Sequence, residues 1–145
     1  MGCAALGRSL GAAALLLLIS GGAASAEEPT GFACTFRAGT TLTYNKAKSS
    51  FRKVGAKPLA FEVSAIDLAA QTAELTTSTS KGKGPLRIVR ALNANHFLEV
   101  VGEGFLNITT IFDRDPKLGA HPAVHSRHFG LFGEPVVAII LLLLS

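Results

Sequence analysis

The sequence contains no tryptophan and only one tyrosine, Tyr44, among its 145 residues. Domains that bind single-stranded nucleic acid present aromatic side chains on which the bases stack, and many sugar sites use aromatic rings in the same way. The net charge is +4, which is well below the basic footprint of a nucleic-acid-binding domain. We therefore expect no nucleic-acid partner and no aromatic platform for sugars.

Apolar runs long enough to cross a bilayer are also missing, since a spanning helix needs about 17 or more apolar residues. The N-terminal run, residues 10–20, follows a single charge at Arg8 and precedes an Ala-Ser-Ala cleavage site at residues 24–26. That order is typical of a secretory signal peptide. We predict that residues 1–26 are removed and that residues 27–145 form one exported domain without a transmembrane span.

Cysteine is scarce, with only two in the whole sequence. Cys3 leaves with the predicted signal peptide, so Cys34 is expected to be the only cysteine of the mature chain. An intramolecular disulfide is then excluded. Exported proteins usually pair their cysteines, so Cys34 is either buried and inert or paired with another chain, and we favour the inert thiol.

No convincing helical period is present outside the predicted signal peptide. Residues 96–112 are instead typical of two strands joined by a turn at residues 102–104, because β-branched and aromatic residues flank glycines that can adopt positive φ. Similar segments separated by turn residues give about eight strands along the chain. We predict an all-β fold, an antiparallel meander that forms a lipocalin-like small barrel or a strongly curled sheet.

The second strand of this hairpin has two unlike faces, because side chains alternate along a strand. One face carries Leu106, Ile108 and Phe112, and the other mixes apolar side chains with an amide and a hydroxyl. The usual antiparallel pattern favours the apolar face as the core, whereas a barrel could line a small cavity with the polar face. The residues that we expect to line any ligand cavity are Phe97, Val101, Leu106, Ile108 and Phe112.

Three histidines, His121, His125 and His128, fall within eight residues. Imidazole binds metals and acts as a general base near neutral pH, so a metal-dependent or hydrolytic activity is one alternative function. On a strand, however, His125 and His128 would lie on opposite faces, and no acid or cysteine stands at ligand spacing. A nucleophile pair with Ser126 is disfavoured because neighbours along a strand point apart. We predict no catalytic residue and no cofactor.

Basic residues concentrate in residues 46–57, where lysines on a sheet edge would discourage edge-to-edge pairing. The alternative is contact with an anionic lipid or polysaccharide, as in a structural or interaction protein of the cell envelope. The final residues, 136–145, form an apolar tail that is too short to span a membrane. Three interpretations of this tail remain open: a strand that closes the sheet, shallow membrane insertion, or an end produced by a frameshift.

Two motifs carry a resemblance to a known group, Cys34-Thr35-Phe36 and the AVHSRH strand at residues 123–128. Over residues 32–136 the chain resembles small, uncharacterised exported bacterial proteins that are rich in β-structure. The resemblance implies export and a β-rich fold, and it implies no activity. Members of that group end in a short polar tail with a second cysteine. This chain ends in an apolar tail without one, which puts a disulfide at Cys34 in doubt.

The sequence therefore favours an exported, non-enzymatic β-barrel of the bacterial periplasm. By analogy with lipocalin-like barrels, its expected use is to bind a small apolar molecule or an envelope component. No motif identifies that ligand or a protein partner.

Overall fold

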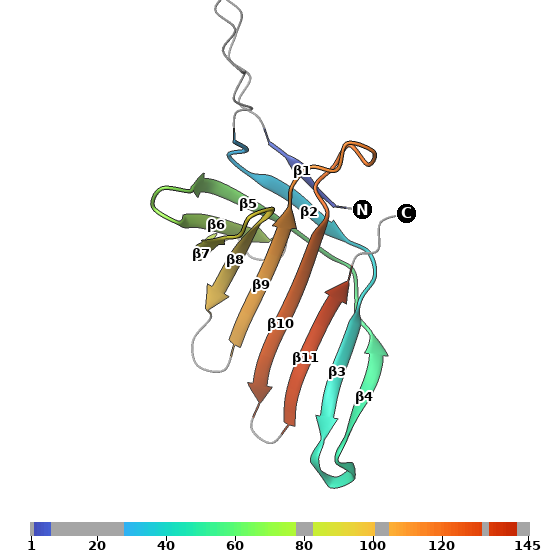
Figure 1. Cartoon of the computed structure of the whole chain (residues 1–145). Coiled ribbons are helices and arrows are strands. Elements are labelled where there is room, and N and C mark those ends of the chain that lie inside the picture. The colour runs from blue at the N-terminus through green and yellow to red at the C-terminus, as the bar shows by residue number, and fades with distance from the viewer. Residues whose placement is uncertain (1, 7–27, 78–82, 101–104, 132–133, 142–145) are drawn as a thin grey trace, which may run out of the picture.

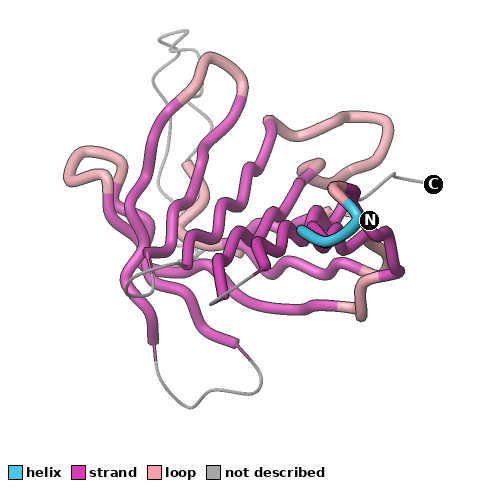
Figure 2. The backbone as a smooth tube through the Cα atoms, turned by 90° about the horizontal axis from the view of Figure 1, so that it is seen from below, coloured by secondary structure: helices cyan, strands magenta, loops and turns pink. Residues whose placement is uncertain are grey.

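The computed structural model describes residues 2–6, 28–77, 83–100, 105–131 and 134–141. Within these residues one antiparallel sheet has the strand order β1-β2-β5-β6-β7-β8-β9-β10-β11-β3-β4. The strands are β1 (Cys3–Ala5), β2 (Phe32–Phe36), β3 (Thr40–Asn45), β4 (Ser50–Gly55), β5 (Leu59–Asp67), β6 (Thr72–Thr77), β7 (Lys83–Arg90), β8 (Ala94–Val100), β9 (Phe105–Phe112), β10 (Ala123–Leu131) and β11 (Glu134–Leu141). The only helical segment of the described chain is a short 3₁₀ turn, η1 (Lys46–Lys48), shown in Figure 2.

The sheet curls until it nearly closes into a barrel (Figure 1). β2 and β3 are halves of one pass broken at residues 37–39, and β4 and β5 are halves of another broken at residues 56–58. β2 pairs with β5, while β3 pairs with both β4 and β11, so the bent passes join the first and last parts of the sheet. Apart from β1 the described residues make eight passes, which confirms the predicted all-β barrel or curled sheet of about eight strands.

The part from β5 to β11 is a meander, because each strand pairs with the next one along the chain. The pairing of β5 with β6 shifts register between Ser64 and Asp67, and Ala65 takes a left-handed φ of 50° there. A bulge of this kind bends its strand and increases the local twist. It therefore contributes to the curl that brings the two parts of the sheet together.

The core lies inside this curl and takes side chains from nearly every part of the sheet. Its largest fully buried members include Phe36, Phe97, Ile111 and Val63. Phe97 is therefore buried, as expected of a residue that faces the barrel interior. Val101, which we expected beside it, lies outside the described residues.

The prediction for the faces of β9 is wrong. Asn107, Thr109 and Ile111 are buried, whereas Leu106 and Ile108 are only half-buried. Phe112 shares the face of Leu106 and Ile108 and is exposed at the end of the strand. The physical reason is that β8 and β10 supply hydrogen-bond partners for the inward amide and hydroxyl, which makes their burial tolerable.

The prediction that Cys34 is an unpaired, inert thiol is also wrong for the uncleaved chain. Cys34 forms a disulfide with Cys3, and β1 pairs with β2 so that these two residues are direct partners. On its other side Cys3 exchanges two backbone hydrogen bonds with His121, at 2.9 and 3.1 Å. Sequence reasoning removed Cys3 together with the predicted signal peptide. Cleavage before Glu27 stays a prediction, and after it only the disulfide and the strand pairing would hold β1 to the rest of the barrel.

The apolar tail forms a strand up to residue 141. β11 pairs with β10 on one side and with β3 on the other, so the interpretation of the tail as a closing strand holds for this part. Residues 142–145 lie outside the described chain. Within the described residues, no helix combines the length and the apolar character needed to cross a membrane.

Candidate functional site

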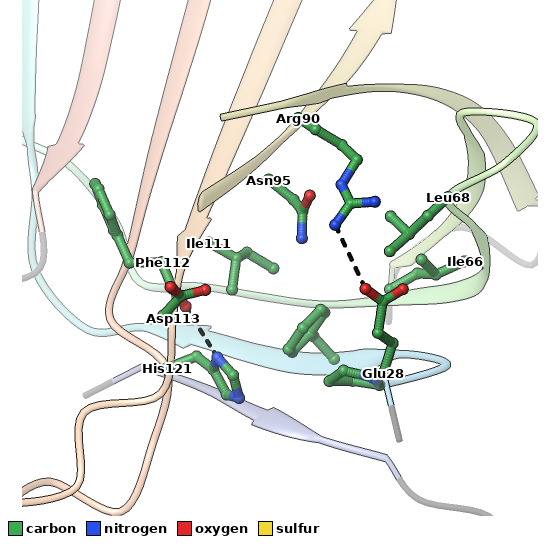
Figure 3. A pocket seen from close by; sticks show the side chains of 11 residues that line it. Glu28, Ile66, Leu68, Arg90, Asn95, Ile111, Phe112, Asp113 and His121 are labelled. Atoms are coloured by element: carbon green, nitrogen blue, oxygen red, sulfur yellow. Dashed lines mark hydrogen bonds and ion pairs between the residues drawn. The ribbon is translucent and has the colours of Figure 1, made fainter. Parts of the chain in front are cut away.

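A pocket of about 140 Å³ lies where the ends of several strands meet (Figure 3), and we call it the end pocket. Its apolar wall combines the start of β2, the end of β5 with the following turn, and the end of β9. Phe32 and Ile111 are buried in this wall, and Ile66 and Leu68 are half-buried. Phe112, one of the five predicted cavity residues, also lines the pocket.

The polar rim of the end pocket comes from segments that are far apart in the sequence. Glu28 precedes β2, and its carboxylate lies 3.4 Å from the guanidinium of Arg90 at the end of β7. Both side chains are more than half exposed, so this ion pair contributes little stability and can be opened by a ligand. Asn95, the register partner of Arg90, adds an amide. Figure 3 shows Arg90 and Glu28 reaching toward each other on one side, with Asp113 and His121 on the other.

His121 contributes an imidazole whose orientation is fixed. Its Nδ1 lies 2.9 Å from the backbone oxygen of Phe112. A carbonyl oxygen can only accept, so Nδ1–H donates, and in the neutral imidazole Nε2 is then an acceptor. The ring also packs edge-on against Phe32, with centroids 5.1 Å apart. Of the three predicted histidines, only His121 reaches the end pocket.

A row of polar side chains crosses three neighbouring strands at another level of the sheet. Asn107 donates its amide to the Glu99 carboxylate at 2.6 Å and accepts from Nε of Arg127 at 3.2 Å. These three residues are direct register partners. The amide therefore bridges two opposite charges. Sequence reasoning gave none of these three residues a role, because their proximity becomes visible only when the register of β8, β9 and β10 is known.

His125 lies in the core next to this row and is only 4% exposed. Its Nδ1 lies 3.0 Å from the hydroxyl of Thr109, and its ring lies 5.3 Å from that of Phe61 and 5.8 Å from that of Phe36. Burial, and then the nearby positive charge of Arg127, lower the pKa of His125 from 6.5 to about 4. The imidazole is consequently neutral at physiological pH, and it packs in the core between the two aromatic rings.

The three histidines do not converge. His125 points inward, whereas His128 lies on the opposite face of β10, as the alternation of the strand predicts. Ser126 and His128 share the other face, because residues i and i+2 of a strand lie on the same side, and His128 Nε2 lies 3.2 Å from the hydroxyl of Ser126. Among the described residues no group of three metal-ligating side chains could hold an ion.

No known protein family, curated protein or solved structure gives a significant match to the chain. The resemblance to exported bacterial proteins accordingly stays a prediction. Function has to be inferred from the geometry of the end pocket and from the distribution of charge and apolar side chains on the surface.

Proposed function

We propose that the protein is an exported, non-enzymatic barrel that binds a compact amphipathic molecule in the end pocket. The observation that carries this proposal is the composition of the pocket. An apolar wall built around Phe32 and Ile111 faces a rim with an exposed ion pair and an oriented imidazole. Ligand sites generally combine such apolar walls with a few placed polar groups.

The volume limits the size of this ligand. Pockets for drug-sized ligands measure about 300–1,000 Å³, whereas an apolar cavity of about 150 Å³ holds a molecule the size of benzene. The end pocket, with about 140 Å³, matches the second case. We therefore propose a ligand with a single ring or short chain, or a larger one that inserts only such a group.

The rim defines the polar end of the ligand. The rim carries two carboxylates, Glu28 and Asp113, and one guanidinium, Arg90. Nε2 of His121 accepts a hydrogen bond when the ring is neutral. This balance favours a donor group, so the proposed ligand class is a small aromatic or aliphatic amine or alcohol, and carboxylates are disfavoured.

Export to the bacterial periplasm is part of the same proposal. It is supported by the Arg8 charge, the apolar run and the Ala-Ser-Ala site within residues 1–26.

Benzylamine and benzoate serve as matched probes, because they share a ring and differ in charge. We expect benzylamine to bind the protein with a dissociation constant at least tenfold lower than that of benzoate. Leu68→Trp should fill the end pocket and weaken benzylamine binding more than tenfold. The measurement is a titration followed by the NMR signals of the residues around the pocket.

Val54→Trp is the control, since Val54 is an exposed residue of β4 and the same ring is added outside the pocket. It should leave benzylamine binding unchanged. Equal binding of both probes, or benzylamine binding that survives Leu68→Trp, would reject the end pocket as a site for this class of ligand.

A further inference from the structure

The hairpin formed by β3 and β4 stands at one end of the strand order. β4 pairs with β3 and with no other strand of the described chain. Figure 1 shows this hairpin at the edge of the sheet, with η1 at its tip. Every residue of β4 and η1 is exposed, so neither segment is needed to cover the barrel core.

Two aromatic side chains lie together near this tip. Tyr44 and Phe51 are direct partners across the hairpin, and their ring centroids are 5.0 Å apart. Phe51 is 61% exposed and Val54 on the same strand is 40% exposed. An exposed phenylalanine does not gain the free energy that burial of its ring would give. Because the core does not require this hairpin, the exposed ring indicates a surface that buries apolar area when it contacts a partner.

Positive charge is concentrated in the hairpin that carries this aromatic pair, and the hairpin itself contains no acidic residue. The sequence has no aspartate or glutamate between Glu28 and Glu62. Over the same stretch the hairpin and its base carry five cationic side chains, and none of them forms an ion pair among the described residues. They are Lys46, Lys48, Arg52, Lys53 and Lys57. We call residues 44–57 the cationic hairpin.

Protection of a sheet edge against aggregation explains only part of this arrangement. Lysines on an edge strand discourage pairing with another sheet, and Lys53 fits that role. Lys46 and Lys48, however, lie in η1 at the tip rather than along the edge of β4. Edge protection also gives no reason to expose Phe51.

We propose that the cationic hairpin docks the protein on an anionic lipid bilayer. Basic side chains near a membrane surface are attracted by anionic headgroups. Tyrosine and other aromatic rings favour the interface between headgroups and acyl chains. A soluble polyanion would use the charges but not the exposed ring of Phe51, and for this reason we assign the bilayer as partner. This site is separate from the end pocket and does not depend on its ligand.

The absence of native tryptophan gives a direct test on the complete chain. Phe51→Trp introduces the only tryptophan of the protein at an exposed position. With vesicles of equal parts phosphatidylglycerol and phosphatidylcholine at low salt, we expect its fluorescence to shift to shorter wavelength and to be quenched by brominated acyl chains. Pure phosphatidylcholine vesicles should produce neither change, and high salt should reverse both.

The charges are tested by vesicle cosedimentation. The triple variant Lys46→Gln, Lys48→Gln and Lys53→Gln should bind phosphatidylglycerol vesicles about 100-fold more weakly, since each basic side chain contributes about fivefold. The matched control is Arg87→Gln, Arg114→Gln and Lys117→Gln, which makes the same change in net charge at exposed positions outside the hairpin. The control variant should retain most of the binding.

Three results would overturn the proposal. The first is an equal loss in both triple variants, which would indicate attraction by net charge alone. The second is an unchanged tryptophan spectrum on vesicles that the protein binds, which would exclude entry of the hairpin into the interface. The third is binding to a soluble acidic polysaccharide that matches vesicle binding and is unaffected by Phe51→Ser, which would point to a polyanion instead.

Discussion

Replacing Cys3 or Cys34 by alanine in the complete chain is expected to lower its free energy of unfolding by about 3–4 kcal/mol. The bond joins residues 31 positions apart, and a covalent link over such a loop removes conformational freedom from the unfolded chain. Both cysteines are buried where β1 meets β2. Loss of the bond therefore also weakens the attachment of a strand that contributes only three residues.

Urea unfolding measures this effect, and the double variant provides an internal test. Either single substitution removes the same bond. The free energy of unfolding of the double variant should therefore lie within about 0.5 kcal/mol of that of the less stable single variant. A reductant should lower the free energy of unfolding of the wild-type protein to that of the variants and leave the stability of the variants unchanged. Additive losses in the double variant would mean that packing of the two side chains, and not the bond, carries the effect.

The same experiment separates the complete chain from a processed one. A chain that has been cleaved before Glu27 and has lost residues 1–26 contains no Cys3, and its stability should not respond to the reductant. The intact mass of the exported product, measured without reductant, identifies which form is present.

Acidification from about pH 7 to pH 4 is expected to cost about 3 kcal/mol of stability through His125 alone. The folded pKa is about 4, lowered first by burial and then by Arg127, against 6.5 as the ordinary value. Between these two values the unfolded chain binds the proton and the folded chain does not. The stability due to the neutral imidazole is therefore fully present above pH 6.5 and is lost progressively as the pH falls toward 4.

His125→Gln removes this titration while keeping an amide that can reach Thr109. The measurement is the difference in unfolding free energy between about pH 7 and pH 4.5, because titration of the carboxylates is common to all variants. The wild-type protein should lose more than His125→Gln by about 2 kcal/mol or more over this interval. His128→Gln is the control, and it should behave like the wild type. A His125→Gln variant with the full acid sensitivity of the wild type would show that His125 is not the group responsible.

The central hairpin illustrates what local sequence can determine. Alternating β-branched and aromatic residues on both sides of Gly102 and Gly104 predict two strands, and the structure has β8 and β9 in these places. The burial of Phe97 follows from the same pattern. Which face of β9 lies inside does not follow, because it depends on the partners that other strands supply. His125 of β10 gives Thr109 a hydrogen-bond partner inside the core, and no property of β9 itself reveals it.

The end pocket shows the same limit at the level of the site. Phe112 and His121 were candidates for different reasons, one as a cavity residue and the other as a metal ligand, and the fold places both in one pocket. Glu28 and Arg90 are 62 positions apart, and no motif connects them. The disulfide of Cys3 was not predicted for another reason. Cys3 lies within the predicted signal peptide and was therefore assumed to be absent from the folded domain.

The pairing of β3 with β11 sets an order of events during synthesis. β3 leaves the ribosome early, yet the partner for one of its edges is the last strand of the described chain. Contacts between segments so distant along the chain form slowly, since a long loop must close before they contribute. The barrel cannot complete its circumference until β11 has been made, and until then β3 and β10 each keep one unpaired edge.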